Sequence, residues 1–289
     1  MFPGAYTALV TPFGRDGAVD YGRLRELVEF QIAGGIDGLV PVGTTGESPT
    51  LDVDEHLEVI RVVVETAARR VKVVAGTGAN STAEALELTA QAKAMGVDGT
   101  LQVTPYYNKP TQAGLIKHFS AVADLGLPVV LYNVPGRAGC EIAVPTVAEL
   151  AQHPHVVAVK EAAGSVDRVS RLKAACEIEV LSGDDGLTLP MMSVGACGVI
   201  SVASNVAPKA VADLVHAAAA GRWDEARALH YKYYALFNDV FIETNPIPIK
   251  AALKMAGLGP AVYRLPLCDM APANRDKLRA TLQACGVVK

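Results

Sequence analysis

The segments PVVLYNVP (128–135) and VVAVKEA (156–162) decide the fold of this chain. Each is a short apolar run rich in β-branched residues and is followed by a segment with a helical pattern, so the pair indicates parallel strands joined by a helix. The same alternation runs from residue 5 to residue 220 and predicts an α/β fold. We expect eight strands, at residues 8–13, 37–43, 72–78, 99–105, 128–135, 156–162, 179–185 and 198–205.

The helical segments and the glycine pattern narrow the architecture. The first expected helix carries one apolar stripe, formed by Leu24, Leu27, Val28 and Ile32. An open doubly wound sheet would usually carry a dinucleotide-binding GxGxxG motif, but AGTGANST at 75–82 lacks the third glycine. We therefore predict a (β/α)8 TIM barrel over residues 1–220. Beyond it, helices are expected at 222–239, 245–258 and 273–285, forming a C-terminal helical domain over residues 221–289.

Composition and charge exclude several classes of protein. Of the 289 residues 51% are hydrophobic, which argues against disorder, and the net charge of −4 argues against nucleic acid or an anionic membrane as partner. Without a signal peptide or a spanning segment, the chain is expected in the cytoplasm. No CxxC or HExxH motif occurs, so no disulfide framework, metal or cofactor is predicted. Asp184 and Asp185 resemble a metal motif, but without a third ligand nearby a loop-capping role is preferred.

Polar residues close the predicted strands. In a (β/α)8 barrel the catalytic groups lie at the carboxyl ends of the strands, so these residues are the functional candidates. They occur at 43–48 after the second strand, 104–108 after the fourth, 132–137 after the fifth, 160–161 in the sixth and 182–185 after the seventh.

Lys160 is the central candidate. It follows VVAV, so its stem is expected to be buried among β-branched residues, where desolvation favours the uncharged amine. An uncharged amine can attack a ketone and form a Schiff base, whose iminium makes the adjacent methyl carbon a nucleophile. The alternative is a structural lysine that is paired with Glu161 or another acid.

Four neighbouring residues complete the expected site. Tyr132 closes the adjacent strand, so its phenol could relay protons at Lys160, and Thr44 could hydrogen-bond that phenol. The backbone N–H groups of the turn around Thr45 could hold a carboxylate. Arg137 follows a Pro-Gly turn and could bind a second carboxylate through its guanidinium. Each of these residues has a structural alternative, such as a packing tyrosine, a turn that binds nothing or a surface arginine.

Taken together, the motifs resemble a known family. GTTGES (43–48), TPYYN (104–108), YNVPGRAG (132–139), VKEA (159–162), SGDD (182–185) and NPIPIK (245–250) occur in the order found in the 4-hydroxy-tetrahydrodipicolinate synthase family, within the N-acetylneuraminate lyase superfamily of pyruvate aldolases. The resemblance covers nearly the whole chain. It implies condensation of pyruvate with aspartate 4-semialdehyde, in lysine and diaminopimelate biosynthesis, through an imine on Lys160.

The resemblance also assigns roles to matching positions. It implies a proton relay of Tyr132, Thr44 and Tyr107. It implies that Thr45 and the Ile200 backbone contact pyruvate, that Arg137 receives the carboxylate of the aldehyde, and that Gly183 lines the pocket. In the family Tyr107 reaches the site of a partner subunit, which implies a homotetramer built as a dimer of dimers.

A feedback site for lysine is implied as well. Its matching positions are Ser48, His56, Asn80, Glu84 and Tyr106. Pro49 and Val53 depart from one version of that site, where a small residue and a polar one stand, so inhibition by lysine is expected to be weaker or absent. Glu84 also has an alternative role, since its spacing from Ser81 is that of a capping box.

Two other functions remain open from the sequence. Another Schiff-base aldolase of the superfamily, such as an N-acetylneuraminate or 2-keto-3-deoxy sugar acid lyase, would share Lys160, Tyr132 and the GTTGE turn. Arg137 favours the dicarboxylate-forming reaction, because sugar-acid lyases generally lack an arginine there. A non-catalytic barrel that binds a small carboxylate is the second alternative.

Overall fold

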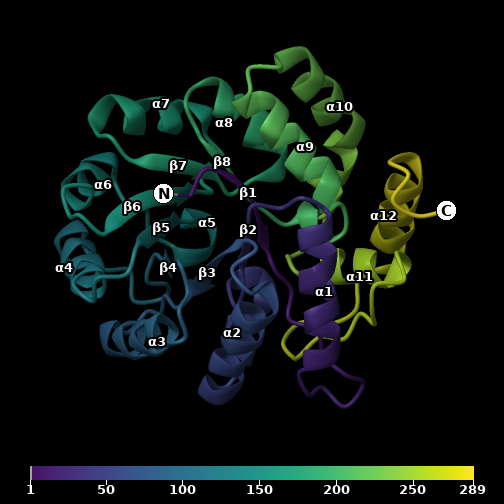
Figure 1. Cartoon of the computed structure of the whole chain (residues 1–289), viewed down its shortest axis with the longest axis horizontal. Helices are drawn as coiled ribbons and strands as arrows, with labels where there is room; N and C mark the ends of the chain where they lie inside the picture. Colours follow the sequence, from purple (N-terminus) through teal and green to yellow (C-terminus); the bar gives the residue numbers. More distant parts are fainter. Residues whose placement is uncertain (1) are drawn as a thin grey trace.

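A computed structural model describes residues 2–289. Eight parallel strands, hydrogen-bonded in sequence order, close into a barrel with helices around it (Figure 1). This arrangement confirms the predicted (β/α)8 barrel. The strands are β1 (Gly4–Ala8), β2 (Gly38–Val40), β3 (Lys72–Gly76), β4 (Gly99–Val103), β5 (Val129–Asn133), β6 (Val156–Glu161), β7 (Glu179–Ser182) and β8 (Gly198–Ser201).

Most of the helices cover the outside of the barrel. They are α1 (Tyr21–Ala33), α2 (Val53–Ala67), α3 (Thr82–Ala94), α4 (Gln112–Ala123), α6 (Val144–Leu150), α7 (Val166–Ala175), α8 (Thr188–Ser193) and α9 (Pro208–Ala219). The short helix α5 (Pro135–Ala138) lies within this ring instead (Figure 1). In α1 the predicted stripe is largely correct, since Leu24, Leu27 and Val28 are buried. Ile32 is only partly buried, and Gln31 takes a core position instead because its Oε1 accepts a hydrogen bond of 2.7 Å from Thr7 on β1.

The prediction for the first strand was wrong. Residues 8–13 were expected to form it, whereas β1 spans Gly4–Ala8. The reason lies at the closure of the barrel, where a Cβ on Gly198 of β8 would stand 1.9 Å from the carbonyl oxygen of Gly4. Two glycines are needed for the backbones to approach, and glycine weakens the strand signal in a sequence.

The other strands end earlier than predicted. The second was expected to extend to Gly43, yet β2 ends at Val40 because Pro41 has no N–H to donate and Val42 adopts a left-handed backbone with φ of 48°. The next residues form a 3₁₀ turn, η1 (Thr44–Gly46). The chain therefore leaves the sheet early and folds its GTTGES residues over the end of the barrel.

The predicted capping box of α3 is absent. Ser81 is the N-cap residue, but its side chain makes no capping hydrogen bond, and both Ser81 and Glu84 are exposed to water, which competes for such bonds. A complete capping box instead begins α2, where Asp52 and Glu55 exchange hydrogen bonds with each other's backbone. Glu84 therefore does not cap α3, the structural role that was the alternative to lysine binding.

The three expected C-terminal helices are present as α10 (Trp223–Asp239), α11 (Ile247–Met255) and α12 (Pro272–Ala284). Helix α10 packs against α9, while α11 and α12 pack on each other beside α1 (Figure 1). The boundary between a barrel domain and a helical domain at residue 220 remains a prediction.

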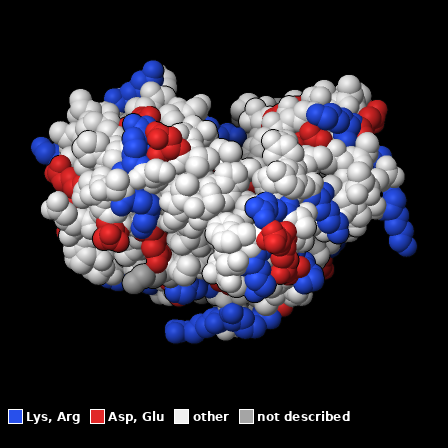
Figure 2. All heavy atoms as spheres, turned by 90° about the horizontal axis from the view of Figure 1, so that it is seen from above, with Lys and Arg blue, Asp and Glu red and all other residues white. Residues whose placement is uncertain are grey.

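The surface carries charges of both signs. Figure 2 shows a face on which Lys and Arg side chains lie among Asp and Glu side chains. Within residues 2–289 no helix has the length and apolar character needed to cross a membrane.

Candidate active site at the carboxyl end of the barrel

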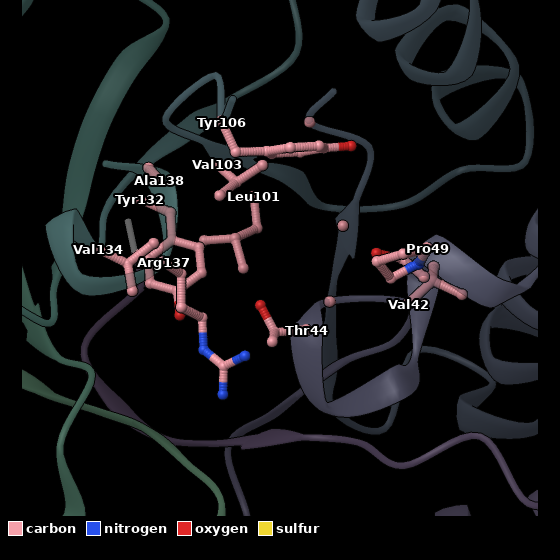
Figure 3. A pocket seen from close by; sticks show the side chains of 14 residues that line it. Val42, Thr44, Pro49, Leu101, Val103, Tyr106, Tyr132, Val134, Arg137 and Ala138 are labelled. Carbon is pink, nitrogen blue, oxygen red and sulfur yellow. The ribbon is translucent and has the colours of Figure 1, made fainter. Parts of the chain in front are cut away.

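A cavity of about 210 Å³ opens at the carboxyl ends of the strands. Three of the residues predicted for catalysis or substrate binding line it, namely Thr44, Tyr132 and Arg137. In Figure 3 Arg137 and Thr44 extend into the same space from opposite sides, below Leu101. The remaining lining residues are Val42, Gly43, Ser48, Pro49, Gly76, Gly78, Leu101, Val103, Tyr106, Val134 and Ala138.

Lys160 lies directly behind one wall of this cavity. It stands beside Tyr132 in the β5–β6 register, is 6% exposed, and its Nζ is 4.3 Å from the centre of the Tyr132 ring. The alternative in which Glu161 pairs with Lys160 is wrong. Because side chains alternate along a strand, Glu161 points to the other face. There it accepts a hydrogen bond of 2.6 Å from Nε of Arg168 and one of 2.8 Å from Nδ2 of Asn133.

The seventh strand supplies a glycine and a carboxylate next to Lys160. A Cβ on Gly183 would stand 3.1 Å from Cε of Lys160, so glycine leaves the room that the lysine stem occupies. Burial raises the pKa of Asp184, an effect that the nearby charge of Lys160 opposes, and its Oδ2 has no hydrogen-bond partner in residues 2–289. Asp185 caps the turn after β8, as predicted, by accepting from the N–H of Val202 at 2.9 Å and that of Ala203 at 3.1 Å.

The turn after β2 presents both threonines. The first hydrogen bond of η1 runs from the N–H of Gly46 to the carbonyl of Gly43, so the N–H groups of Thr44 and Thr45 have no partner within the turn. The hydroxyl of Thr45 is buried and accepts a hydrogen bond of 2.9 Å from Nδ2 of Asn245. No hydrogen bond links Thr44 to Tyr132 within the described residues, contrary to the expectation.

Arg137 stands at the mouth of the cavity on the short helix α5. Its Nη2 donates a hydrogen bond of 3.1 Å to the carbonyl oxygen of Asn245, and its side chain is otherwise largely exposed. A guanidinium held at one corner keeps further N–H donors for a second carboxylate.

Two predicted residues lie apart from the cavity. Ile200 is 1% exposed on β8 and is not among the residues that line the cavity. Tyr107 is 91% exposed and has a left-handed backbone, with φ of 71°, which is unusual for a bulky residue. Its side chain points into solvent and makes no part of this chain's own site.

The five residues expected to bind lysine gather around a second cavity, also of about 210 Å³. Ser48, His56, Glu84 and Tyr106 line it, and Asn80 lies beside it with Nδ2 donating to the carbonyl of Tyr106 at 3.2 Å. Ser48, Pro49, Gly78 and Tyr106 line both cavities, which are therefore neighbours. Burial lowers the pKa of His56, whose Nε2 is 2.8 Å from the carbonyl oxygen of Gly76.

Sequence reasoning missed the residues that hold the GTTGES turn from the C-terminal segment. Asn245 bonds to Thr45, and Lys250 forms an ion pair with Glu47 in which both side chains are buried. The available signal was a lysine inside the apolar repeat of NPIPIKAAL. In a helix that packs on a barrel, such a position is expected to face the protein interior.

Comparison with known proteins gives a consistent family. The model of the dihydrodipicolinate synthetase family matches residues 1–285. The 4-hydroxy-tetrahydrodipicolinate synthase of Geobacter sulfurreducens is 55% identical over 286 residues, 98% of each chain.

Solved structures agree with this result. The dihydrodipicolinate synthase of Acinetobacter baumannii complexed with pyruvate has a TM-score of 0.98 and 45% identity, and all of both chains is covered. The enzyme of Cyanidioschyzon merolae with lysine bound has a TM-score of 0.95 and 42% identity over 99% of each chain. On the full-length family match and these identities, the chain belongs to the dihydrodipicolinate synthetase family.

Proposed function

We propose that this chain condenses pyruvate with aspartate 4-semialdehyde to give 4-hydroxy-tetrahydrodipicolinate, through an imine on Lys160. The observation that carries the proposal is the position of Lys160. Its amine is buried at the end of β6, next to the phenol of Tyr132 and behind a small cavity that also presents Arg137. The family name of its relatives describes the same reaction.

The first half-reaction joins pyruvate to the protein. The amine of Lys160 attacks C2 of the ketone in its deprotonated form, and the carbinolamine then loses water to give an iminium. Tyr132 passes the protons that these steps require, with Thr44 beside the same space. The N–H groups of Thr44 and Thr45 donate hydrogen bonds to the carboxylate of pyruvate, and the backbone of Ile200 borders it.

The second half-reaction forms the new carbon–carbon bond. The iminium draws electrons from C3, which loses a proton and becomes an enamine carbon. That carbon attacks the aldehyde carbon of the second substrate, whose carboxylate is held by Arg137. The amine of the same substrate then attacks C2, closes the ring and displaces Lys160.

Borohydride trapping tests the covalent step. Wild-type protein incubated with pyruvate and borohydride is expected to gain a reduced pyruvyl group on the peptide that contains Lys160, whereas Lys160→Met is expected to gain none. An adduct on another residue would refute the mechanism, and a protein that only binds carboxylates would gain no mass. Aspartate 4-semialdehyde, glyceraldehyde and N-acetylmannosamine should then be compared as acceptors, because a sugar-acid lyase would prefer one of the latter two.

We propose further that the protein is a homodimer in which Tyr107 completes the proton relay of the partner, and that two dimers form a tetramer. The outward position of Tyr107 supports the first interface, since a phenol with 91% exposure cannot serve its own cavity. An exposed apolar surface supports another interface on α8 and α10, where Trp223 and Tyr231 line the same surface hollow as Leu189 and Pro190.

Subunit complementation tests the role of Tyr107. Tyr107→Ala and Lys160→Met are each expected to be inactive, but a mixed dimer would combine an intact Lys160 of one chain with an intact Tyr107 of the other. Mixing and reassembly of the two variants should therefore restore activity. If Tyr107 acted within its own chain, no mixture would be active.

We propose weak or absent inhibition by lysine at the second cavity. Glu84, which is free of a capping role, supplies a carboxylate for the amino groups of lysine, and the shared wall gives a route to Thr44 and Tyr132. Pro49 and Val53 line the same cavity and offer no polar contact. Calorimetric titration with lysine tests this proposal, and submicromolar affinity would contradict it.

The five free cysteines support a reducing compartment, which we propose to be the cytoplasm.

A further inference from the structure

A buried ion pair joins the C-terminal segment to the active-site turn. Lys250 on α11 and Glu47 after η1 are each 2% exposed, and the ammonium of Lys250 contacts a carboxylate oxygen of Glu47. Lys250 also donates to the carbonyl oxygen of Val262 at 2.9 Å and lies 4.1 Å from the centre of the Phe13 ring. Burial lowers the pKa of Lys250 to about 8, which reflects the cost of placing this charge in the interior.

The position of Glu47 gives this pair a mechanical role. Glu47 has a left-handed backbone, with φ of 55°, and its N–H closes η1 by bonding to the carbonyl of Thr44 at 3.1 Å. A non-glycine residue keeps such a backbone only where its surroundings enforce it. The buried side chain of Glu47 is therefore an anchor for the turn that presents Thr44 and Thr45.

Arg264 holds the same turn from its outer side. Its backbone N–H lies 3.4 Å from Oε2 of Glu47, and its guanidinium donates to the carbonyl oxygen of Thr50 at 2.7 Å and to the carboxylate of Glu55 at 2.5 and 2.6 Å. It also donates to the carbonyl oxygen of Gly17 at 2.9 Å. These contacts fix Glu47 and the residues that follow it, as far as Glu55, to one segment of the C-terminal region.

Asn245 connects the C-terminal segment to the substrate cavity as well. Its side chain holds the hydroxyl of Thr45, and its carbonyl oxygen holds the guanidinium of Arg137. Residues 245–264 therefore contact both the turn expected to hold pyruvate and the arginine expected to hold the second substrate. We call this set the C-terminal clamp, formed by Asn245, Lys250 and Arg264.

We propose that Lys250 is a positioning residue for the condensation, acting through Glu47 to hold the Thr44–Thr45 turn in the geometry that binds pyruvate. The inference rests on the proposed function above. The alternative hypothesis is that the Lys250–Glu47 ion pair only stabilises the fold. The two hypotheses predict different results when both charges are removed. Replacing a buried ion pair by neutral groups often leaves stability intact. The anchor that Glu47 gives the Thr44–Thr45 turn would still be lost.

The experiment compares Lys250→Met, Glu47→Gln and the double variant with wild type, and uses Lys254→Met as control. Lys254 is exposed on the same helix and touches neither the turn nor the cavity walls. Four quantities are measured for each protein: the melting temperature, the KM for pyruvate, kcat, and hydrogen exchange of the peptide covering residues 43–50.

The single variants should melt at lower temperature, because each leaves an unpaired buried group. The double variant should recover most of that loss and yet keep a KM for pyruvate raised about tenfold or more, since misplacement of a binding group by about 1 Å costs on the order of a hundredfold. Its 43–50 peptide should exchange faster than in wild type, and Lys254→Met should behave as wild type.

Recovery of both stability and KM in the double variant would overturn the inference, and so would unchanged exchange in residues 43–50. A kcat that falls alone, without a change in KM, would also overturn it. If wild-type protein forms no imine with pyruvate, the proposed function fails first, and that result is separate from the exchange measurement, which reports on the clamp without substrate.

Discussion

Gly183→Ala is expected to impair imine formation without unfolding the protein. A Cβ at this position would stand 2.6 Å from Cβ of Ala162 and 3.1 Å from Cε of Lys160, whereas ordinary contacts begin at 3.4 Å. Ala162 follows the last residue of β6, and Lys160 lies two residues before it on that strand. The added methyl group would therefore press on the side chain of the reactive lysine.

The magnitude follows from these distances. Overpacking of this kind costs about 1–3 kcal/mol, equivalent to a fall in Tm of several degrees at about 2–4 °C per kcal/mol for large domains. A shift of Lys160 by several tenths of an ångström should slow imine formation about tenfold to a hundredfold, since a misplacement of about 1 Å costs on the order of a hundredfold. The loss of activity should therefore exceed what the fall in stability explains.

Rapid borohydride trapping with pyruvate measures the rate of imine formation, and thermal unfolding measures stability. Gly186→Ala is the matched control in the segment after β7, because its nearest new contact would be at an ordinary 3.7 Å from Oδ1 of Asn238. Adding Ala162→Gly to Gly183→Ala should recover part of both losses, since it removes the closest contact. A Gly183→Ala protein that forms the imine at the wild-type rate would refute the reasoning about the position of Lys160.

Arg137→Ala should raise the KM for aspartate 4-semialdehyde about thirtyfold or more while imine formation stays near wild type, because a charged partner of one carboxylate is lost; steady-state and trapping assays separate the two, and equal losses would contradict the role. Tyr231→Glu, at a side chain 75% exposed on α10, should convert tetramers to dimers in sedimentation while Lys160 still forms its adduct; intact tetramers would exclude this surface. The lowered pKa of Lys250, about 8 against 10.5, means that the unfolded chain binds more protons between these values, so this group's stabilising contribution is lost as pH falls through about 8. Lys250→Met should flatten the rise in unfolding free energy between pH 8 and 10, measured by denaturant titration; an unchanged slope would contradict the shifted pKa.

The sequence predicts this barrel well because each strand is a local signal. Seven of the eight expected runs contain the whole of the observed strand, and the residues that follow these strands carry the polar groups of the cavity. Lys160, Tyr132 and Thr44 could be predicted to lie at one end of the barrel because the carboxyl ends of neighbouring parallel strands must meet. The first strand was misplaced because it begins at Gly4, which weakens the strand pattern in the sequence. The glycine is needed for close backbone contact with β8, and that contact exists only in the closed barrel.

The C-terminal clamp could not be predicted in the same way. Asn245 and Thr45 are separated by 200 residues, and Lys250 and Glu47 by 203, so no local pattern brings them together. What the sequence does contain is a charged residue at each end, a lysine in an apolar helical repeat and a glutamate in the GTTGES turn that follows an apolar strand. Two buried charges of opposite sign need partners, and neither had one within its own segment. Such pairs of charges in distant segments therefore point to tertiary contacts, and here the contact reaches the turn on which substrate binding is expected to depend.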